Sequence, residues 1–184
     1  MIGQITDLDQ YRAGPWGPPA PGHPAFMRTL WAPYDDVHAA LLALAGTATR
    51  ELVVAMFGFT DTELGAVVEG KLNDPGIRCE VTLDKSQASG PTERRMLDTL
   101  GMLESNTVAV GTSEKSAIMH RKVMIVDRRW LVTGSTNWSL SAETRQDNQL
   151  TVVDDPVSAA EAGMVLALEH EKARTQMAKA AGRG

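Results

Sequence analysis

The chain has 184 residues, of which 43% are hydrophobic and 22% charged, a composition that excludes a disordered chain and suffices for one domain with a full core. Its single cysteine, Cys79, excludes both an internal disulfide and a thiolate zinc site within one chain. A formal net charge of −5 argues against indiscriminate binding to nucleic acid, which a basic surface normally supports.

Residues 111–145 carry more positive than negative charge. They contain six basic and three acidic residues, a local balance of +3, so the rest of the chain sums to −8. Two interpretations stay open: a phosphate-binding face on an otherwise acidic body, or solvated surface charges with no common purpose.

The start of the chain has the features of neither a secretory signal nor a membrane anchor. Asp7 and Asp9 follow soon after Met1, without a basic start or an apolar stretch. The longest apolar run, residues 39–45, is far shorter than the roughly 20 residues that span a bilayer. We expect a soluble, cytoplasmic protein with no stable membrane association.

Residues 1–27 are predicted to form a proline- and glycine-rich N-terminal arm. Five prolines and several glycines fall between residues 10 and 25, which excludes a helix or a central strand there. Such an arm can be a free tail or can wrap a partner subunit, and composition does not separate these alternatives. A single catalytic domain is expected over residues 28–178, and a flexible tail over residues 179–184.

From residue 28 the chain alternates between strand-like and helix-like segments. Thr60 and Glu63 have the spacing of a capping box that opens one of the helices. The alternation is typical of βαβ units, and it predicts an α/β domain with a mixed, largely parallel sheet sandwiched by helices on both faces. The strands are expected at residues 28–32, 52–57 and 77–83, and the helices at residues 37–44, 60–72 and 92–103.

The second half is richer in strands. A tight hairpin turn is expected at residues 127–129, between two of them. A long helix over residues 157–178 ends the domain. The expected strands are residues 108–110, 122–126, 130–133 and 150–153.

His120 and Lys122 lie at the start of one of these strands. Because side chains alternate along a strand, both should project from the same face, whereas Arg121 points away. A neutral imidazole nitrogen can attack phosphorus, and a nearby ammonium group stabilises the charge that develops on the phosphoryl oxygens. The pair therefore predicts a phosphate-reacting pocket that requires no metal.

The segment after the hairpin offers neutral hydrogen-bond donors to the same phosphate. Gly134 lets the backbone approach an anion closely, and the Ser135 hydroxyl and the Asn137 amide can donate to it. The hairpin turn brings this segment beside the strand of His120. The two parts together predict an anion cradle.

This pattern resembles the HKD signature of the phospholipase D superfamily: His120-x-Lys122-xxxx-Asp127, then Gly134-Ser135-x-Asn137. Residues 53–60 and 81–87 also look like the single-motif bacterial endonucleases of that superfamily, so the resemblance extends from about residue 28 to about residue 173. It implies that His120 forms a covalent phosphohistidine or protonates the leaving oxygen.

The resemblance also implies roles for the remaining motif residues. Lys122 and Asn137, with Ser135 and the Gly134 backbone, would hold the phosphate. Asp127 would have a structural role away from the phosphorus. No metal and no other cofactor is implied.

An acidic residue further along the chain usually orients the histidine through its second ring nitrogen in this family. Asp147 matches that position, although relatives of this branch more often carry glutamate there. The shorter side chain could weaken the orientation of His120.

The chain carries one motif, whereas the two-step reaction needs a nucleophile on one side of the phosphorus and a proton donor on the other. A two-fold homodimer with one composite site on its axis is the simplest solution. This expectation follows from the mechanism.

Three functions are compatible with the sequence. The first is an endonuclease, whose partner is the nucleic acid, DNA or RNA, that it cleaves. The second is a phospholipase D-type lipid phosphodiesterase or transphosphatidylase, for which an apolar membrane-facing loop would be expected. The third is a catalytically silent relative that binds nucleic acid.

Other conspicuous side chains have simpler interpretations. His23, His38 and His170 have no partners at informative spacing and are expected to be surface or core residues. Trp138 is expected to pack in the core rather than to stack on a nucleobase.

Overall fold

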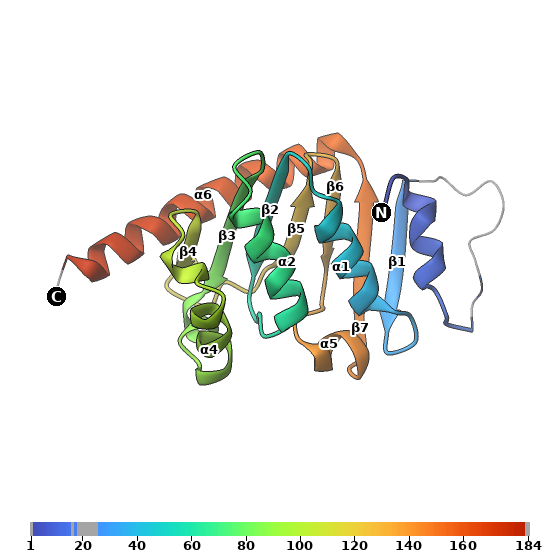
Figure 1. Ribbon diagram of the computed structural model, residues 1–184, viewed down its shortest axis with the longest axis horizontal. Helices are drawn as coiled ribbons and strands as arrows, with labels where there is room; N and C mark the ends of the chain where they lie inside the picture. Colours follow the sequence, from blue (N-terminus) through green and yellow to red (C-terminus); the bar gives the residue numbers. More distant parts are fainter. Residues whose placement is uncertain (1, 16, 18–25, 183–184) are drawn as a thin grey trace.

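A computed structural model describes residues 2–15, 17 and 26–182 of the chain. Within these residues, seven strands form one sheet in the order β1-β7-β6-β5-β2-β3-β4 (Figure 1). Their bounds are β1 Met27–Ala32, β2 Glu51–Met56, β3 Arg78–Asp84, β4 Val108–Gly111, β5 Lys122–Val126, β6 Trp130–Gly134 and β7 Asn148–Asp154.

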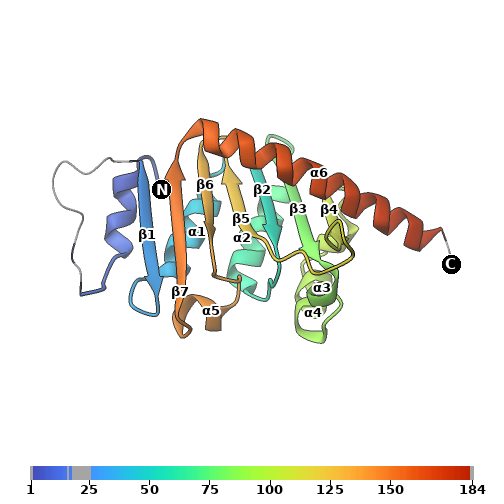
Figure 2. The ribbon, with the colours of Figure 1, turned by 180° about the vertical axis from the view of Figure 1, so that it is seen from behind.

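The helices cover both faces of this sheet, as expected. Figure 1 shows α1 and α2 in front of the strands, and Figure 2, from behind, shows α6 running across the opposite face. The helical bounds are η1 Ile5–Tyr11, α1 Val37–Thr47, α2 Thr62–Leu72, α3 Lys85–Ala88, α4 Pro91–Thr99, η2 Met102–Glu104, α5 Leu140–Thr144 and α6 Pro156–Ala181, where η marks a 3-10 helix.

The sheet is mixed, but the expectation that it is largely parallel is wrong. Only β2 with β3 and β3 with β4 pair in parallel. The other four pairings are antiparallel. Parallel neighbours need a crossover of a dozen or more residues, and β5 and β6 are too close in sequence to contain one. The βαβ pattern therefore describes only the first half of the chain.

Strand β2 forms the centre of the core because both of its faces are buried. Leu52, Val54 and Met56 pack into the larger cluster, on the side of α1 and α2. Val53 and Ala55 pack into a smaller cluster with residues of α6. A continuous apolar run is the expected sequence of a strand covered on both faces.

The first part of the predicted arm belongs to the domain, which corrects the expected boundary at residue 28. Ile5 and Leu8 in η1 are buried, as is Ile2 before it, and all three join the larger core cluster. A spacing of three residues places Ile5 and Leu8 on one face of this 3-10 helix. Most of the proline-rich stretch, residues 18–25, lies outside the described residues.

Several helix ends differ from those expected. Asp61, not Thr60, caps α2, with its side chain accepting from the backbone N–H groups of Glu63 and Leu64. The helix expected up to residue 103 stops at Thr99, and the left-handed Gly101 separates it from η2. Helix α6 continues to Ala181, so residues 179–181 of the expected tail are helical, whereas residues 183–184 lie outside the described residues.

Among the described residues, none of the helices combines the length and the apolar character that crossing a bilayer requires.

Candidate active site

His120 and Lys122 meet on one aromatic ring at the start of β5. The exposed His120 ring lies edge-on to Phe57, with 4.6 Å between ring centroids. The Lys122 ammonium nitrogen lies 4.8 Å from the centroid of the same ring and 3.4 Å from the His120 backbone carbonyl oxygen. The alternation along the strand thus places both groups on one side, as predicted.

Lys122 is a buried cation. Its side chain is only 8% exposed, and burial lowers its pKa. Within the described part of the chain it forms no salt bridge with a carboxylate. An ammonium group without a fixed counter-ion is suited to an anionic ligand.

Asn137 is held next to this pair by backbone pairing. Trp138 donates its N–H to the Gly58 carbonyl oxygen, and a β-carbon added at Gly58 would lie 3.4 Å from the Asn137 side chain. Gly58 directly follows Phe57, so Asn137 lies near the ring that His120 and Lys122 share. The Asn137 Oδ1 atom is buried and has no hydrogen-bond partner among the described residues. The Asn137 Nδ2 group likewise makes no hydrogen bond with the described residues, so its N–H groups can donate to an anionic ligand.

Gly134 and Ser135, which the sequence suggested as phosphate-binding residues, lie in the contact between β6 and β7. A β-carbon at Gly134, where φ is +157°, would lie 2.1 Å from the Gln149 carbonyl oxygen, so the glycine is required by the contact between β6 and β7. The Ser135 hydroxyl donates to Asn148 Oδ1 at 2.8 Å and accepts from the Gln149 N–H. Both residues connect β6 to β7. Because the Ser135 hydroxyl donates its single proton to Asn148, that proton is not available to a phosphate.

Asp127 lies at the opposite end of β5, in the hairpin turn where Asp127 and Arg128 both have positive φ. Its carboxylate accepts from the backbone N–H groups of Thr49, Arg50 and Glu51 and from the Thr49 hydroxyl. Burial raises its pKa, but these donors outweigh burial and leave the pKa below its ordinary value. The arrangement matches a structural role that ties the hairpin to the start of β2.

Asp147 does not contact His120 of its own chain. It is exposed, directly precedes β7, and lines a hollow of about 600 Å³ together with Trp31, Tyr34 and Ser135. Within the described residues, the ring nitrogens of His120 have no hydrogen-bond partner. No carboxylate in the described part of this chain therefore orients His120.

A groove of about 500 Å³ begins at His120 and runs between the segment before β5 and α6. Arg121 and Lys172 line it, paired with Glu169 and Glu114 respectively. Ile118 and Leu168 also line it, and both are at least half exposed.

The local excess of positive charge does not gather on one face. Arg128 and Arg129 lie past the far end of β5 from His120, where they pair with Glu51 and Asp154. The groove therefore receives only part of the +3 balance expected for this segment.

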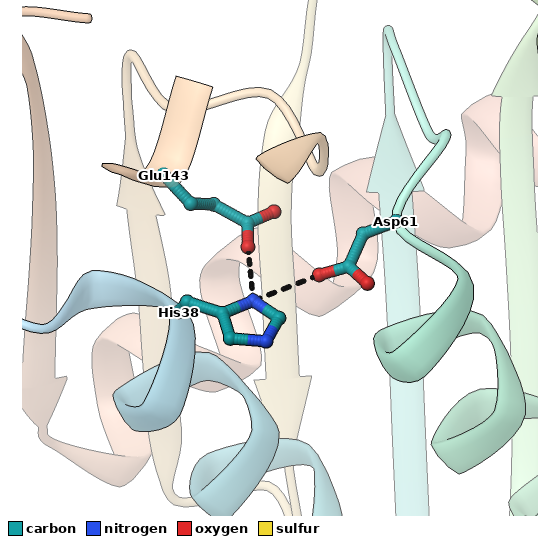
Figure 3. A group of neighbouring side chains, drawn as sticks. All are labelled: His38, Asp61 and Glu143. Atoms are coloured by element: carbon teal, nitrogen blue, oxygen red, sulfur yellow. Dashed lines mark hydrogen bonds and ion pairs between the residues drawn. The ribbon is translucent and has the colours of Figure 1, made fainter. Parts of the chain in front are cut away.

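One cluster of titratable side chains was missed by the sequence interpretation. His38, Asp61 and Glu143 come together beside the segment that carries Asn137, from α1, the cap of α2 and α5 (Figure 3). Residues 38, 61 and 143 are too far apart in sequence for their spacing to indicate a contact. By contrast, His170 is a core histidine, hydrogen-bonded to the Thr82 hydroxyl at 2.9 Å, and Trp138 is buried against Phe59.

Comparisons with known proteins agree with this geometry. Residues 41–166 match the family model described as cardiolipin synthase, PLD-like domain. A mitochondrial cardiolipin hydrolase of Chlamydomonas reinhardtii is 33% identical over 111 residues, which are 60% of this chain and 47% of that protein. The chain thus spans about half the length of this curated relative.

Two solved bacterial structures have the same fold. Nuc from Salmonella typhimurium, a phospholipase D family member, superposes with a TM-score of 0.64 at 21% identity, covering 82% of this chain and 93% of Nuc. NucT from Helicobacter pylori superposes with a TM-score of 0.67 at 20% identity, covering 80% of this chain and 96% of NucT.

Proposed function

The chain belongs to the phospholipase D superfamily, and from that premise we propose that it is a metal-independent nuclease that cleaves phosphodiester bonds in DNA or RNA. One observation carries the proposal: His120, Lys122 and Asn137 gather around Phe57 and Gly58. Among the described residues, the His120 ring nitrogens and the Asn137 amide make no hydrogen bond, and the Lys122 ammonium group has no carboxylate partner. A nucleophile, a cation and an amide are the groups that an attack on a phosphodiester requires.

The proposed reaction has two steps. A neutral His120 nitrogen attacks phosphorus, a P–N bond forms, and the P–O bond to the leaving group breaks while an acid protonates the leaving oxygen. Water then attacks the phosphohistidine, a base removes its proton, and the P–N bond breaks. Lys122 and Asn137 bind the non-bridging oxygens in both steps, and no metal ion takes part.

We propose that the acid is His120 of a second copy in a two-fold homodimer. The chain has one motif, and the proton donor must lie on the far side of the phosphorus from the nucleophile. The unpartnered ring nitrogens of His120 support this proposal, because its orienting carboxylate, for which Asp147 is the candidate, would then come from the other copy.

A nucleic-acid substrate is favoured by the groove. Lys115, Arg121 and Lys172 line the groove beside His120, where they can follow a polyanionic backbone.

A lipid phosphodiester is the second candidate, and exposed apolar residues support it. Val157, Met164, Val165 and Leu168 on α6 are 45–75% exposed, and their spacing places them on one face of the helix. Leu168 lines the groove, so this face continues into it. The curated relative is named a cardiolipin hydrolase. A silent nucleic-acid-binding relative is the third candidate, against which the complete motif counts.

The test compares substrates under identical conditions. Single-stranded DNA, duplex DNA, RNA and cardiolipin vesicles are incubated with the protein in excess chelator, with the fold checked by circular dichroism. We expect cleavage of nucleic acid and a loss of at least about 1000-fold in His120→Ala. Arg128→Ala, which removes a positive charge at the far end of β5, should leave the rate unchanged.

The other outcomes separate the candidates. Turnover of cardiolipin without cleavage of nucleic acid would establish the lipid candidate instead. Binding of nucleic acid without cleavage would favour the silent relative. Strict dependence of a folded protein on a divalent ion would contradict the metal-independent mechanism.

A further inference from the structure

His38, Asp61 and Glu143 form a carboxylate–histidine cluster that the proposed reaction does not use. Figure 3 shows both carboxylates directed at the same ring nitrogen of His38. His38 Nδ1 lies 2.6 Å from Glu143 Oε2 and 3.0 Å from Asp61 Oδ2. Glu143 is fully buried and Asp61 is 5% exposed, so water reaches neither carboxylate freely.

The Nδ1 proton alone leaves this cluster poorly satisfied. A ring nitrogen carries one proton, so Nδ1 can donate fully to only one of the two carboxylates. Asp61 Oδ2 and Glu143 Oε1 are buried and have no hydrogen-bond partner among the described residues. If both carboxylates were ionised beside one imidazolium, the cluster would keep a net negative charge in a buried place, which is costly. A further positive charge would remove both deficits.

The donor set fits a divalent transition metal. One imidazole nitrogen and two carboxylate oxygens, all within 4.8 Å of one another, are ligands that Zn²⁺ accepts, whereas Mg²⁺ and Ca²⁺ prefer oxygen alone. Tetrahedral bonds of about 2.0–2.2 Å separate neighbouring ligand atoms by about 3.3–3.6 Å. The Glu143 and Asp61 oxygens, now 2.6 and 3.0 Å from His38 Nδ1, would therefore move away from that nitrogen by about 1 Å or less. The unpartnered Glu143 Oε1 or a water can complete four-coordination.

We propose that His38, Asp61 and Glu143 bind one divalent transition-metal ion, with zinc as its type, in a structural site next to the Asn137 segment. The ion replaces the Nδ1 proton and binds both carboxylates together. It does not touch the substrate, so the proposal is independent of the proposed function.

Such an ion would stabilise the anion-binding side of the active site. The Asp61 backbone N–H donates to the Trp138 carbonyl oxygen, and Trp138 directly follows Asn137. Glu143 lies on α5, which begins three residues after Asn137. His38 anchors both segments to the first turn of α1. The ion would therefore hold the Asp61 segment and α5, which both adjoin the Asn137 segment, in a fixed position relative to α1.

The experiment uses tag-free protein, stripped of metal by a chelator and then titrated with Zn²⁺ by calorimetry, with the melting temperature measured with and without the ion. We expect one Zn²⁺ per chain and a higher melting temperature, with no such effect of Mg²⁺. In His38→Gln the affinity should fall by at least about 100-fold, because a ligand is lost. Glu143→Gln preserves the shape of a buried side chain and should lower the zinc affinity to a similar extent. If His38→Gln does not fold, this second variant tests the proposal.

Glu63→Gln is the matched control. The Glu63 carboxylate lies 3.6 Å from the other ring nitrogen of His38 and its side chain is 74% exposed, so its loss should not change zinc binding. Absence of zinc binding by the wild-type chain, or binding that is unchanged in both ligand variants, would overturn the proposal. The cluster would then be a hydrogen-bond network shared by protons. Neither result bears on whether His120 cleaves nucleic acid.

Discussion

Glu93 is a buried carboxyl group next to the active site. One of its oxygens accepts from the Phe59 backbone N–H at 2.7 Å, and the other has no partner among the described residues. Burial raises its pKa, the Phe59 N–H partly opposes this, and the nearby Asp84 raises it further, to about 7. Glu93 therefore holds a proton at pH values where an exposed glutamate has lost it.

This protonation predicts how stability depends on pH. Because the folded state holds the Glu93 proton more tightly than the unfolded state, its contribution to stability is complete below about pH 4.5 and is lost as the pH rises through about 7. The change from 4.5 to about 7 corresponds to about 3 kcal/mol at about 1.36 kcal/mol per pKa unit. Between pH 5 and 7 the free energy of unfolding should therefore fall less in Glu93→Gln than in the wild-type protein.

Urea unfolding of wild type and variant at several pH values measures the difference. The exposed Glu104, replaced by Gln, is the control and should keep the wild-type slope. An identical pH dependence in wild type and Glu93→Gln would show that Glu93 is ionised throughout this range.

At the scale of elements, the junction of β6 and β7 depends on Gly134. The backbone of β7 passes so close that any β-carbon at this position meets the Gln149 carbonyl oxygen. The sequence showed that a glycine stands here but not what it contacts, because the partner strand lies 14 residues further along. Gly134 thus allows β6 and β7 to pack closely, and this packing positions the Asn137 segment that follows β6.

Gly134→Ala should therefore destabilise the protein by about 3 kcal/mol or more, because backbone atoms of one strand must move. Gly70→Ala is the matched substitution. Gly70 lies in α2 with nothing within 4 Å of an added β-carbon, so the change should raise stability by up to about 1 kcal/mol through helix propensity. Thermal unfolding of both variants measures the contrast, and equal effects would exclude this explanation of Gly134.

At the scale of the whole molecule, the composite site requires that both copies act together. If each active site contains His120 from both subunits, a dimer of one wild-type and one His120→Ala chain is inactive. With threefold excess of the variant and free exchange of subunits, activity per wild-type chain should fall to roughly one quarter, the fraction of wild-type chains that meet a wild-type partner.

The measurement mixes the two proteins under conditions of subunit exchange and follows cleavage of an oligonucleotide. An excess of Arg128→Ala in place of His120→Ala is the control. Because this variant is expected to be active, the activity per chain of the mixture, counted over both proteins, should stay at the wild-type value. Full activity of wild-type chains in excess His120→Ala would mean that each chain works alone.

The sequence by itself determined the local part of this protein. Strand alternation placed His120 and Lys122 on one face, and the hairpin turn at Asp127 brought β6 beside β5. These features depend on residues close in sequence, whose geometry follows from short-range stereochemistry.

Only the tertiary structure decided the rest, because it depends on residues far apart in the chain. It made the pairings β1–β7, β2–β5 and β6–β7 antiparallel, placed Ile5 and Leu8 in the core, and assigned the Ser135 hydroxyl to Asn148. It also brought His38 to two carboxylates from distant segments. Each of these contacts is set by how the elements pack, and no spacing along the chain encodes it.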